Sequence, residues 1–392
     1  MTASAQNTPR KVALYANVGH ELLHYDVDVA GAALIKRSAI TAPASVQYAW
    51  PHASGHYLYV ASSNNTQGST QHYVTVFRIA PQTGELAKRG ESLQLPVRPI
   101  HITTDIPSEH VLVAFNIPSG VRVFRIDKDF TLGEEIKQSG PIDGGIYAHQ
   151  IRVTPDSRHA ILVTRGNGAT PTRPEDPGAL KMFDYARGAL SNEASIAPDG
   201  GRGFAPRHLD FHPTKPWVYV SLEIQSKMYM YRMEKGRLTS DTVYRKDTVA
   251  EPNNMRPRQL AGTIHVHPNG RFVYVANRAD GTVEFKGKKV FRGGENSIAV
   301  YSIDQSTGEP TPIQHIDTRK VYPRTFHIDP SGRLLVVQHN RPVNVRDGDE
   351  VRLVAAGMSV FRIGNDGKLT FVRTYDVDVG DQTMFWMGMV QL

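Results

Sequence analysis

The chain has 392 residues, of which 40% are hydrophobic, enough for a large core. It contains no cysteine, which excludes disulfides and thiolate metal sites and makes a reducing cytoplasm the expected setting. The formal net charge is +7, with no long run of lysine or arginine. This pattern argues against a nucleic-acid-binding surface and favours basic residues gathered around a small anion.

The N-terminal segment 1–10, "MTASAQNTPR", has no apolar stretch of the kind found in a secretory signal. We expect it to be a disordered lead-in. No apolar run approaches the ~20 residues that a membrane helix needs, so no membrane association is expected. Residues 11–392 are expected to form one domain, present as a monomer or a small homo-oligomer.

A strand-like motif with an aromatic residue recurs along the chain, as in "VTVFRIA" (74–80) and "VRVFRID" (121–127). Its seven copies lie at 22–28, 74–80, 121–127, 180–186, 228–234, 296–303 and 358–364. Period-two alternation and Gly/Pro/Asp punctuation predict strands, and no segment keeps a helical period. Each copy belongs to a unit of four strands, so the sequence predicts an all-β, seven-bladed β-propeller.

The two ends of the chain look like parts of one blade. "KVALYANVG" (11–19) matches the second strand of a unit without its first, and "TMFWMGMVQL" (383–392) matches a first strand without its partner. The N- and C-terminal strands are therefore expected to close the first blade, which leaves no open edge between the first and last blades.

A turn residue between the first and second strands aligns six units without gaps. The turn residues are Pro51, Thr104, Pro155, Pro213, Pro268 and Pro330. Six positions earlier stand Ser45, Arg98, His149, Arg207, Gly262 and Arg324, and ten positions later stand Ala61, Ala114, Arg165, Glu223, Arg278 and Asn340. Folding each hairpin at its turn brings these two positions to the same end. The first strand of a propeller blade lines the central channel, so the side chains should converge on one rim of that channel.

Several cations at one opening repel one another by roughly 2–3 kcal/mol per pair at ~6–8 Å and an effective dielectric near 20. An anionic ligand would offset this cost, and guanidinium groups suit carboxylate or phosphate. The candidate catalytic residues are Glu223, His149, Arg207 and Arg278; the candidate substrate-binding residues are Arg98, Arg165, Arg324, Asn340 and His101. Simpler interpretations stay open: solvated arginines, Glu223 in a structural ion pair, and His149 as a hydrogen-bonded channel histidine.

Other motifs predict no cofactor, metal or covalent nucleophile. His101, His208, His265 and His327 lie further along the first strands, where hydrogen bonds within the channel or between blades are expected. The sequence has no HExxH, no histidine with a carboxylate at metal spacing, no phosphate-binding glycine loop and no GxSxG. The long connections 166–179, 250–262, 279–297 and 341–357 are expected at the same rim, as lids or as plain surface loops.

Five blocks resemble a known family. They are "RPIHITTD", "AHQIRVTPDSRHAILV", "APRHLDFHPTKPWVYVSLE", "TIHVHPNGRFVYVANR" and "YPRTFHIDPSGRLLVV". They resemble the seven-bladed propeller lactonases, the group of bacterial propeller-type 6-phosphogluconolactonases and fungal 3-carboxy-cis,cis-muconate lactonizing enzymes. The resemblance implies a metal-independent enzyme for an acidic lactone. It also implies a His, Arg, Glu, Arg set at His149, Arg207, Glu223 and Arg278. The long loops depart from the compact bacterial members.

The main hypothesis is hydrolysis of a small anionic lactone. Arg207 and Arg278 would bind the acid group or polarise the ester carbonyl, and Glu223 or His149 would act as general base. Neighbouring arginines should lower the pKa of Glu223, which favours Glu223 as the base and leaves His149 to protonate the departing alkoxide. A cycloisomerase acting on a muconolactone of aromatic breakdown is one alternative. A non-catalytic propeller that binds a partner protein is another, but its loops should expose aromatic anchors, and they hold mainly Arg, Asn, Asp and Gly.

Overall fold

Seven antiparallel sheets follow one another along the chain in the computed structural model, which describes residues 11–64 and 68–392. The predicted lead-in over 1–10 lies outside the described residues. The second blade holds β4 (Val46–Pro51), β5 (Tyr57–Ser63), β6 (His72–Ile79) and β7 (Leu86–Gln94). The third holds β8 (Pro99–Thr104), β9 (His110–Asn116), β10 (Ser119–Ile126) and β11 (Leu132–Glu135). The fourth holds β12 (Ala148–Val153), β13 (His159–Thr164), β14 (Ala179–Ala186) and β15 (Ala189–Ile196).

The later blades repeat this order. The fifth holds β16 (Pro206–Phe211), β17 (Trp217–Leu222) and β18 (Lys227–Glu234), with β19 (Arg237–Leu238) and β20 (Tyr244–Asp247) both paired to β18. The sixth holds β21 (Gln259–Val266), β22 (Phe272–Ala279), β25 (Ser297–Ile303) and β26 (Pro310–Asp317). The seventh holds β27 (Pro323–Ile328), β28 (Leu334–His339), β31 (Gly357–Ile363) and β32 (Leu369–Asp376). Two short 3-10 helices, Pro198–Gly201 and Pro252–Asn254, lie between blades.

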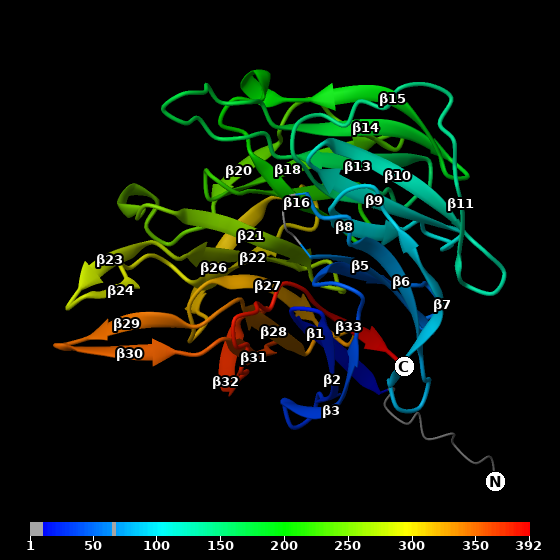
Figure 1. The fold of residues 1–392 in the computed structure, drawn as a ribbon. Coiled ribbons are helices and arrows are strands. Elements are labelled where there is room, and N and C mark those ends of the chain that lie inside the picture. Colours follow the sequence, from blue (N-terminus) through cyan, green and yellow to red (C-terminus); the bar gives the residue numbers. More distant parts are fainter. Residues whose placement is uncertain (1–10, 65–67) are drawn as a thin grey trace, which may run out of the picture.

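The two ends of the chain close the first blade, as the sequence predicts. This sheet has the order β3 (Ala33–Thr41), β2 (Glu21–Asp28), β1 (Val12–Val18), β33 (Met387–Gln391). Val12 pairs with Gln391 and Ala16 with Met387, and Figure 1 shows the blue and red strands side by side. The innermost strands β33, β4, β8, β12, β16, β21 and β27 contact one another in that order, and β27 contacts β33. The predicted seven-bladed propeller is therefore confirmed.

Period-two alternation explains how the blades pack. In β17, Val218 and Val220 face the fourth blade and pack with Ile161 and Val163 of β13. The intervening Tyr219 faces the sixth blade, where it joins the core around β22. Successive side chains of a strand point to opposite faces of its sheet, so one apolar strand supplies the core on both sides.

Two of the long connections contain regular structure. Residues 279–297 include the hairpin β23 (Thr282–Phe285) and β24 (Lys288–Phe291), and residues 341–357 include β29 (Val343–Asp347) and β30 (Glu350–Val354). Figure 1 shows both hairpins projecting from the ring. They contact each other: Asn344 Nδ2 donates to Lys289 O at 3.3 Å. Each segment satisfies its backbone hydrogen bonds by pairing with itself, and whether the hairpins act as lids stays a prediction. Within the described residues, no helix has the length and apolar character to cross a membrane.

Candidate active site

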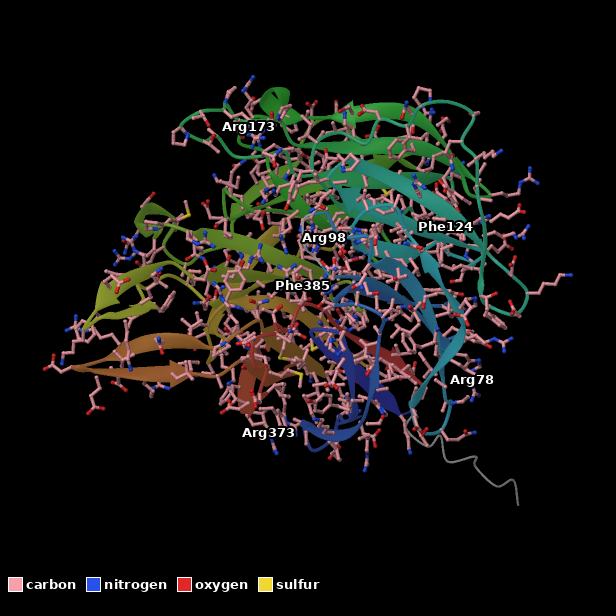
Figure 2. All side chains as sticks on the ribbon, in the orientation of Figure 1. Arg78, Arg98, Phe124, Arg173, Arg373 and Phe385 are labelled. Carbon is pink, nitrogen blue, oxygen red and sulfur yellow. The ribbon has the colours of Figure 1, made fainter. Side chains whose placement is uncertain are left out.

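A cavity of about 430 Å³ lies where blades three to seven meet at one end of the channel. It is lined by Arg98, Ile100, Tyr147, His149, Arg165, Arg207, Glu223, Ile224, Arg258, Leu260, Arg278, Tyr322, Arg324 and Phe385. Figure 2 shows Arg98 and Phe385 near the middle of the molecule, whereas Arg173 and Arg373 lie at its edge. Seven of the nine residues predicted from the sequence are brought together here.

The strand ends place these side chains. Arg207 lies in β16 at the start of the fifth blade, and Glu223 directly follows β17 of the same hairpin. Arg165 directly follows β13, and Arg278 lies near the end of β22. The first and second strands of a blade are antiparallel, so the start of one and the end of the other lie at the same rim.

Three arginines from three blades bind the Glu223 carboxylate. Arg207 Nη1 lies 2.6 Å from Oε1, Arg165 Nη1 lies 2.9 Å from Oε2, and Arg278 Nη2 also pairs with Oε1. Glu223 is 3% exposed and Arg278 1% exposed, so this cluster is desolvated. Such charge-assisted hydrogen bonds fix both partners in position.

The charges in this cluster shift one another's pKa values. Burial alone would raise the pKa of Glu223, but Arg207, Arg278 and Arg165 hold it well below its usual range. The carboxylate is therefore ionised at neutral pH, as the sequence predicts. Burial and the nearby Arg278 lower the pKa of Arg207 to about 10, so this guanidinium keeps its charge.

The arginines outnumber the carboxylates, and several of their donors have no acceptor. Among the described residues, buried Arg207 Nε, Arg278 Nε and Nη1, and Arg324 Nε lack a hydrogen-bond partner. The Arg324 guanidinium carbon lies 3.4 Å from the centre of the Phe385 ring. Burial and the charges of Arg207 and Arg278 lower the pKa of Arg324. Unpaired buried donors cost about 1–3 kcal/mol each, so these donors are unfavourable until an acceptor meets them.

Arg98 lies on the third blade's side of the cavity and is half-buried. Its Nε and Nη2 both donate to Gln47 Oε1, at 2.9 and 2.7 Å. Gln47 is neutral, so it orients the guanidinium without cancelling its charge. Arg98 and Arg324 thus present uncompensated positive charge from the third and seventh blades, on either side of the Glu223 cluster.

His149 lines the cavity and is 7% exposed. Its Nδ1 is buried without a partner among the described residues, and its ring meets His208 at a centroid distance of 5.0 Å. Burial, followed by the charges of Arg207, Arg324, Arg165 and Arg278, lowers the pKa of His149 well below its ordinary value. The imidazole is therefore neutral at neutral pH and has a lone pair available to accept a proton.

Two predicted substrate-binding residues do not line this cavity. Asn340 lines a neighbouring one of about 480 Å³, and its Nδ2 donates to Met384 O at 2.9 Å. His101 is fully buried below the rim, where its ring lies 4.0 Å from that of Tyr48. Asn340 thus ties the seventh blade to the C-terminal segment, and His101 packs inside the channel.

Sequence reasoning missed four lining residues that bear on the chemistry: Tyr147, Tyr322, Arg258 and Phe385. The two tyrosines directly precede β12 and β27. Both stand eight positions before a turn proline, so the alignment that found Arg207 could have found them too. Arg258 pairs with Asp280 at 2.6 Å, which leaves the surplus positive charge to the other arginines.

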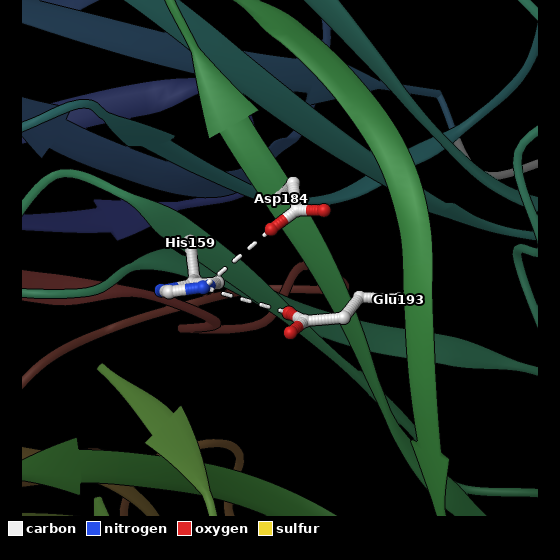
Figure 3. Close-up of side chains that lie close together, drawn as sticks. All are labelled: His159, Asp184 and Glu193. Atoms are coloured by element: carbon white, nitrogen blue, oxygen red, sulfur yellow. Dashed lines mark ion pairs between the residues drawn. The ribbon is translucent and has the colours of Figure 1, made fainter. Parts of the chain in front are cut away.

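A separate cluster lies on the fourth blade, shown in Figure 3. His159 Nε2 lies 3.6 Å from both Asp184 Oδ1 and Glu193 Oε2, and Arg237 of the fifth blade pairs with Glu193. The donor types are those that bind divalent ions. Spacing along the sequence did not predict this group because its members come from three different strands. None of the four residues lines the cavity around Glu223.

Comparison with known proteins agrees with this fold. The family described as "Lactonase, 7-bladed beta-propeller" matches residues 11–347. A 6-phosphogluconolactonase of Bacillus subtilis (strain 168) is 29% identical over 317 residues, covering 76% of this chain and 82% of that protein. A 6-phosphogluconolactonase of Pectobacterium carotovorum is 28% identical over 265 residues, covering 67% and 70%.

Solved structures show the same architecture. A protein of Bacteroides fragilis superposes with a TM-score of 0.72 at 19% identity, covering 99% of this chain and all of that one. The periplasmic gluconolactonase PpgL of Pseudomonas aeruginosa gives a TM-score of 0.70 at 17% identity, covering 97% and 99%. The chain therefore belongs to the seven-bladed β-propeller lactonases, a family of lactone-hydrolysing enzymes.

Proposed function

We propose that the protein hydrolyses a small lactone that carries a carboxylate or a phosphate. The observation that carries this proposal is the set of buried guanidinium donors without acceptors around one carboxylate. An anionic substrate would accept from these donors and offset the repulsion between the arginines. The two relatives named 6-phosphogluconolactonase support a phosphorylated sugar lactone as the first substrate to test.

His149 is the general base in this proposal. Its neutral imidazole would take a proton from water while the water oxygen adds to the lactone carbonyl carbon. The pKa of His149 is low partly because of the surrounding arginines. A bound anion would screen those charges and raise the pKa of His149 toward the working pH. The same imidazolium would then give its proton to the ring oxygen as the C–O bond breaks, and a hydroxy acid would leave.

The arginines supply the electrostatic part of the reaction. Arg207 and Arg278 keep unused buried donors, which would donate hydrogen bonds to the carbonyl oxygen as negative charge develops on it. Arg324, Arg98 and Arg165 would hold the substrate's anionic group. Glu223 is a weak base because three arginines hold its carboxylate. Its role would be to orient them and to balance the charge of the His149 imidazolium.

The direct test is a screen of anionic sugar lactones and aromatic-derived lactones, followed by proton release at controlled pH. Spontaneous opening is subtracted with a His149→Gln variant prepared in the same way. Running the reaction in ¹⁸O-water separates hydrolysis from cycloisomerisation, because only hydrolysis incorporates the label. We expect label in the product, and the same rate after treatment with EDTA. The proposal is contradicted if the original protein opens none of the lactones faster than the variant does, or if the product carries no label.

A further inference from the structure

Three blades share an uncommon backbone conformation beside the cavity. Tyr147 and Tyr322 directly precede β12 and β27, and their φ angles are +58° and +59°. Ala205 holds the same place before β16, with φ at +38°. The left-handed region costs a residue with a Cβ about 1–2 kcal/mol, so glycine is its usual occupant. A strained backbone conformation that recurs at equivalent positions of a site indicates a function for the residues that adopt it.

The backbone of these residues positions the opposite end of each hairpin. Tyr147 O accepts a hydrogen bond from Arg165 N at 2.9 Å, and Ala205 O accepts one from Glu223 N at 2.9 Å. Tyr322 O accepts one from Asn340 N at 3.4 Å. The left-handed residues therefore tie the chain that carries Arg165 and Glu223 to the start of the inner strand. Glycine could make the same backbone bonds, so they do not explain the tyrosine side chains.

The aromatic rings of the two tyrosines make contacts that glycine could not make. The Arg165 guanidinium carbon lies 4.2 Å from the centre of the Tyr147 ring, and that of Arg278 lies 5.2 Å from the centre of the Tyr322 ring. These two arginines reach Glu223 from the blades on either side of it. A cation over an aromatic face gains about 0.5–2 kcal/mol, and this contact restricts how the guanidinium can move.

The hydroxyl groups take no part in this support. Neither Tyr147 nor Tyr322 makes a side-chain hydrogen bond to another described residue, whereas buried Tyr15 and Tyr219 each donate to a backbone carbonyl. At the fifth blade the equivalent residue is Ala205, beside Glu223 itself. The rings therefore accompany Arg165 and Arg278, whereas a methyl group lies next to Glu223.

We propose that Tyr147 and Tyr322 are positioning residues of the lactonase reaction: their rings hold Arg165 and Arg278 in the planes that bind Glu223. This inference rests on the proposed function. It assigns the positioning of the two arginines to the aromatic rings and not to the hydroxyl groups. Loss of a ring should let one arginine of the cluster rotate and leave the transition state less well stabilised.

The experiment compares Tyr147→Gly and Tyr322→Gly with Tyr147→Phe and Tyr322→Phe. Glycine removes the ring and relieves the strain at positive φ, so the variants should keep their thermal stability while kcat falls at least tenfold and KM changes less. Phenylalanine keeps the ring, so kcat should stay within about threefold of the original protein. Arg187→Gly is the matched control, because Arg187 also has a positive φ, of +49°, but lies in the turn between β14 and β15.

Two results would overturn the inference. Glycine variants with full kcat would show that the rings position nothing that matters for the reaction. Phenylalanine variants as slow as the glycine variants would assign the task to the hydroxyls. Both results require that the unaltered protein opens a lactone, whereas failure of the proposed function would appear as inactivity of the unaltered protein itself.

Discussion

Arg207 and Glu223 face each other across the first hairpin of the fifth blade, with 2.6 Å between Nη1 and Oε1. Both are almost fully buried, and Arg165 and Arg278 bind the same carboxylate from the neighbouring blades. Glu223 is thus the one carboxylate among the described lining residues of a cavity rich in arginine. We expect the balance between these charges to affect both stability and the proposed chemistry.

The first prediction concerns Glu223→Gln. It leaves the buried guanidinium groups of Arg207 and Arg278, and the half-buried one of Arg165, without their shared carboxylate. Breaking a buried pair costs about 3–5 kcal/mol. Urea unfolding should show this loss, together with a lower kcat. Inorganic phosphate should restore part of the stability by taking the place of the carboxylate. Glu91→Gln is the control, because the Glu91 side chain is 99% exposed. A variant as stable as the original protein contradicts this view of the cluster.

The pH dependence of stability has a defined sign. The pKa of Glu223 is lower in the folded protein than its ordinary value of 4.5. Its contribution is therefore complete above about pH 4.5 and is lost as the pH falls toward the folded-state pKa. The difference in unfolding free energy between the original protein and Glu223→Gln should shrink over that range.

The second prediction concerns His149 as the base. Its pKa in the free enzyme lies well below 6.5, so kcat/KM should keep its value down to a pH below 6.5. In the substrate complex, the bound anion should raise the pKa of His149. The acid limb of the kcat profile should therefore lie at higher pH than that of the kcat/KM profile. His149→Gln should lower kcat by about 10²–10⁴ and remove the limb. His101→Gln should leave both profiles unchanged. Coincident limbs for kcat and kcat/KM would rule out the proposed response of His149 to substrate.

The third prediction separates binding from stability at Arg324. This cation has no carboxylate partner among the described residues, and its neighbours Arg207 and Arg278 repel it. Arg324→Met should therefore leave the free protein at least as stable. It should raise KM for an anionic lactone ~30-fold or more, equivalent to about 2 kcal/mol. Arg78→Met, at the edge of the molecule in Figure 2, should change neither quantity. Destabilisation with unchanged KM would make Arg324 a structural residue.

The fourth prediction tests Asn340, which the sequence places among the substrate-binding residues. In the structure its Nδ2 donates to Met384 O, beside the strand that closes the ring. Asn340→Ala should cost about 1–2 kcal/mol of stability through the unpaired carbonyl, and kcat/KM should stay within about threefold. A tenfold loss of kcat/KM at unchanged stability would instead support substrate binding.

The fold could be predicted because its signals are local and repeated. Alternating strands and turn residues fixed the hairpin register, and the register alone placed Arg207 opposite Glu223. The same alignment placed Asn340 at the rim, but it does not say which way a side chain turns. That choice depends on Met384 of the terminal segment, which comes from a different blade.

Three other features were not predicted, and only one of them had a local signal in the sequence. The left-handed tyrosines carry no composition signal, since glycine is the residue that usually marks such positions. The hairpin over 282–291 did have a signal. Lys286-Gly287 stands between two alternating segments, and both residues have positive φ, as two-residue hairpin turns require. His159, Asp184 and Glu193 come together only through strand pairing.

The most direct test of the central claim compares two lactones that differ by one phosphate group: 6-phosphogluconolactone and glucono-1,5-lactone. Initial rates are measured by proton release, with spontaneous opening subtracted. We expect kcat/KM to favour the phosphorylated lactone by ~10²-fold, since the unpaired arginines should supply about 2–3 kcal/mol to its anion. High salt and Arg324→Met should both reduce this preference. Equal kcat/KM values for the two lactones would contradict a cavity built for an anion.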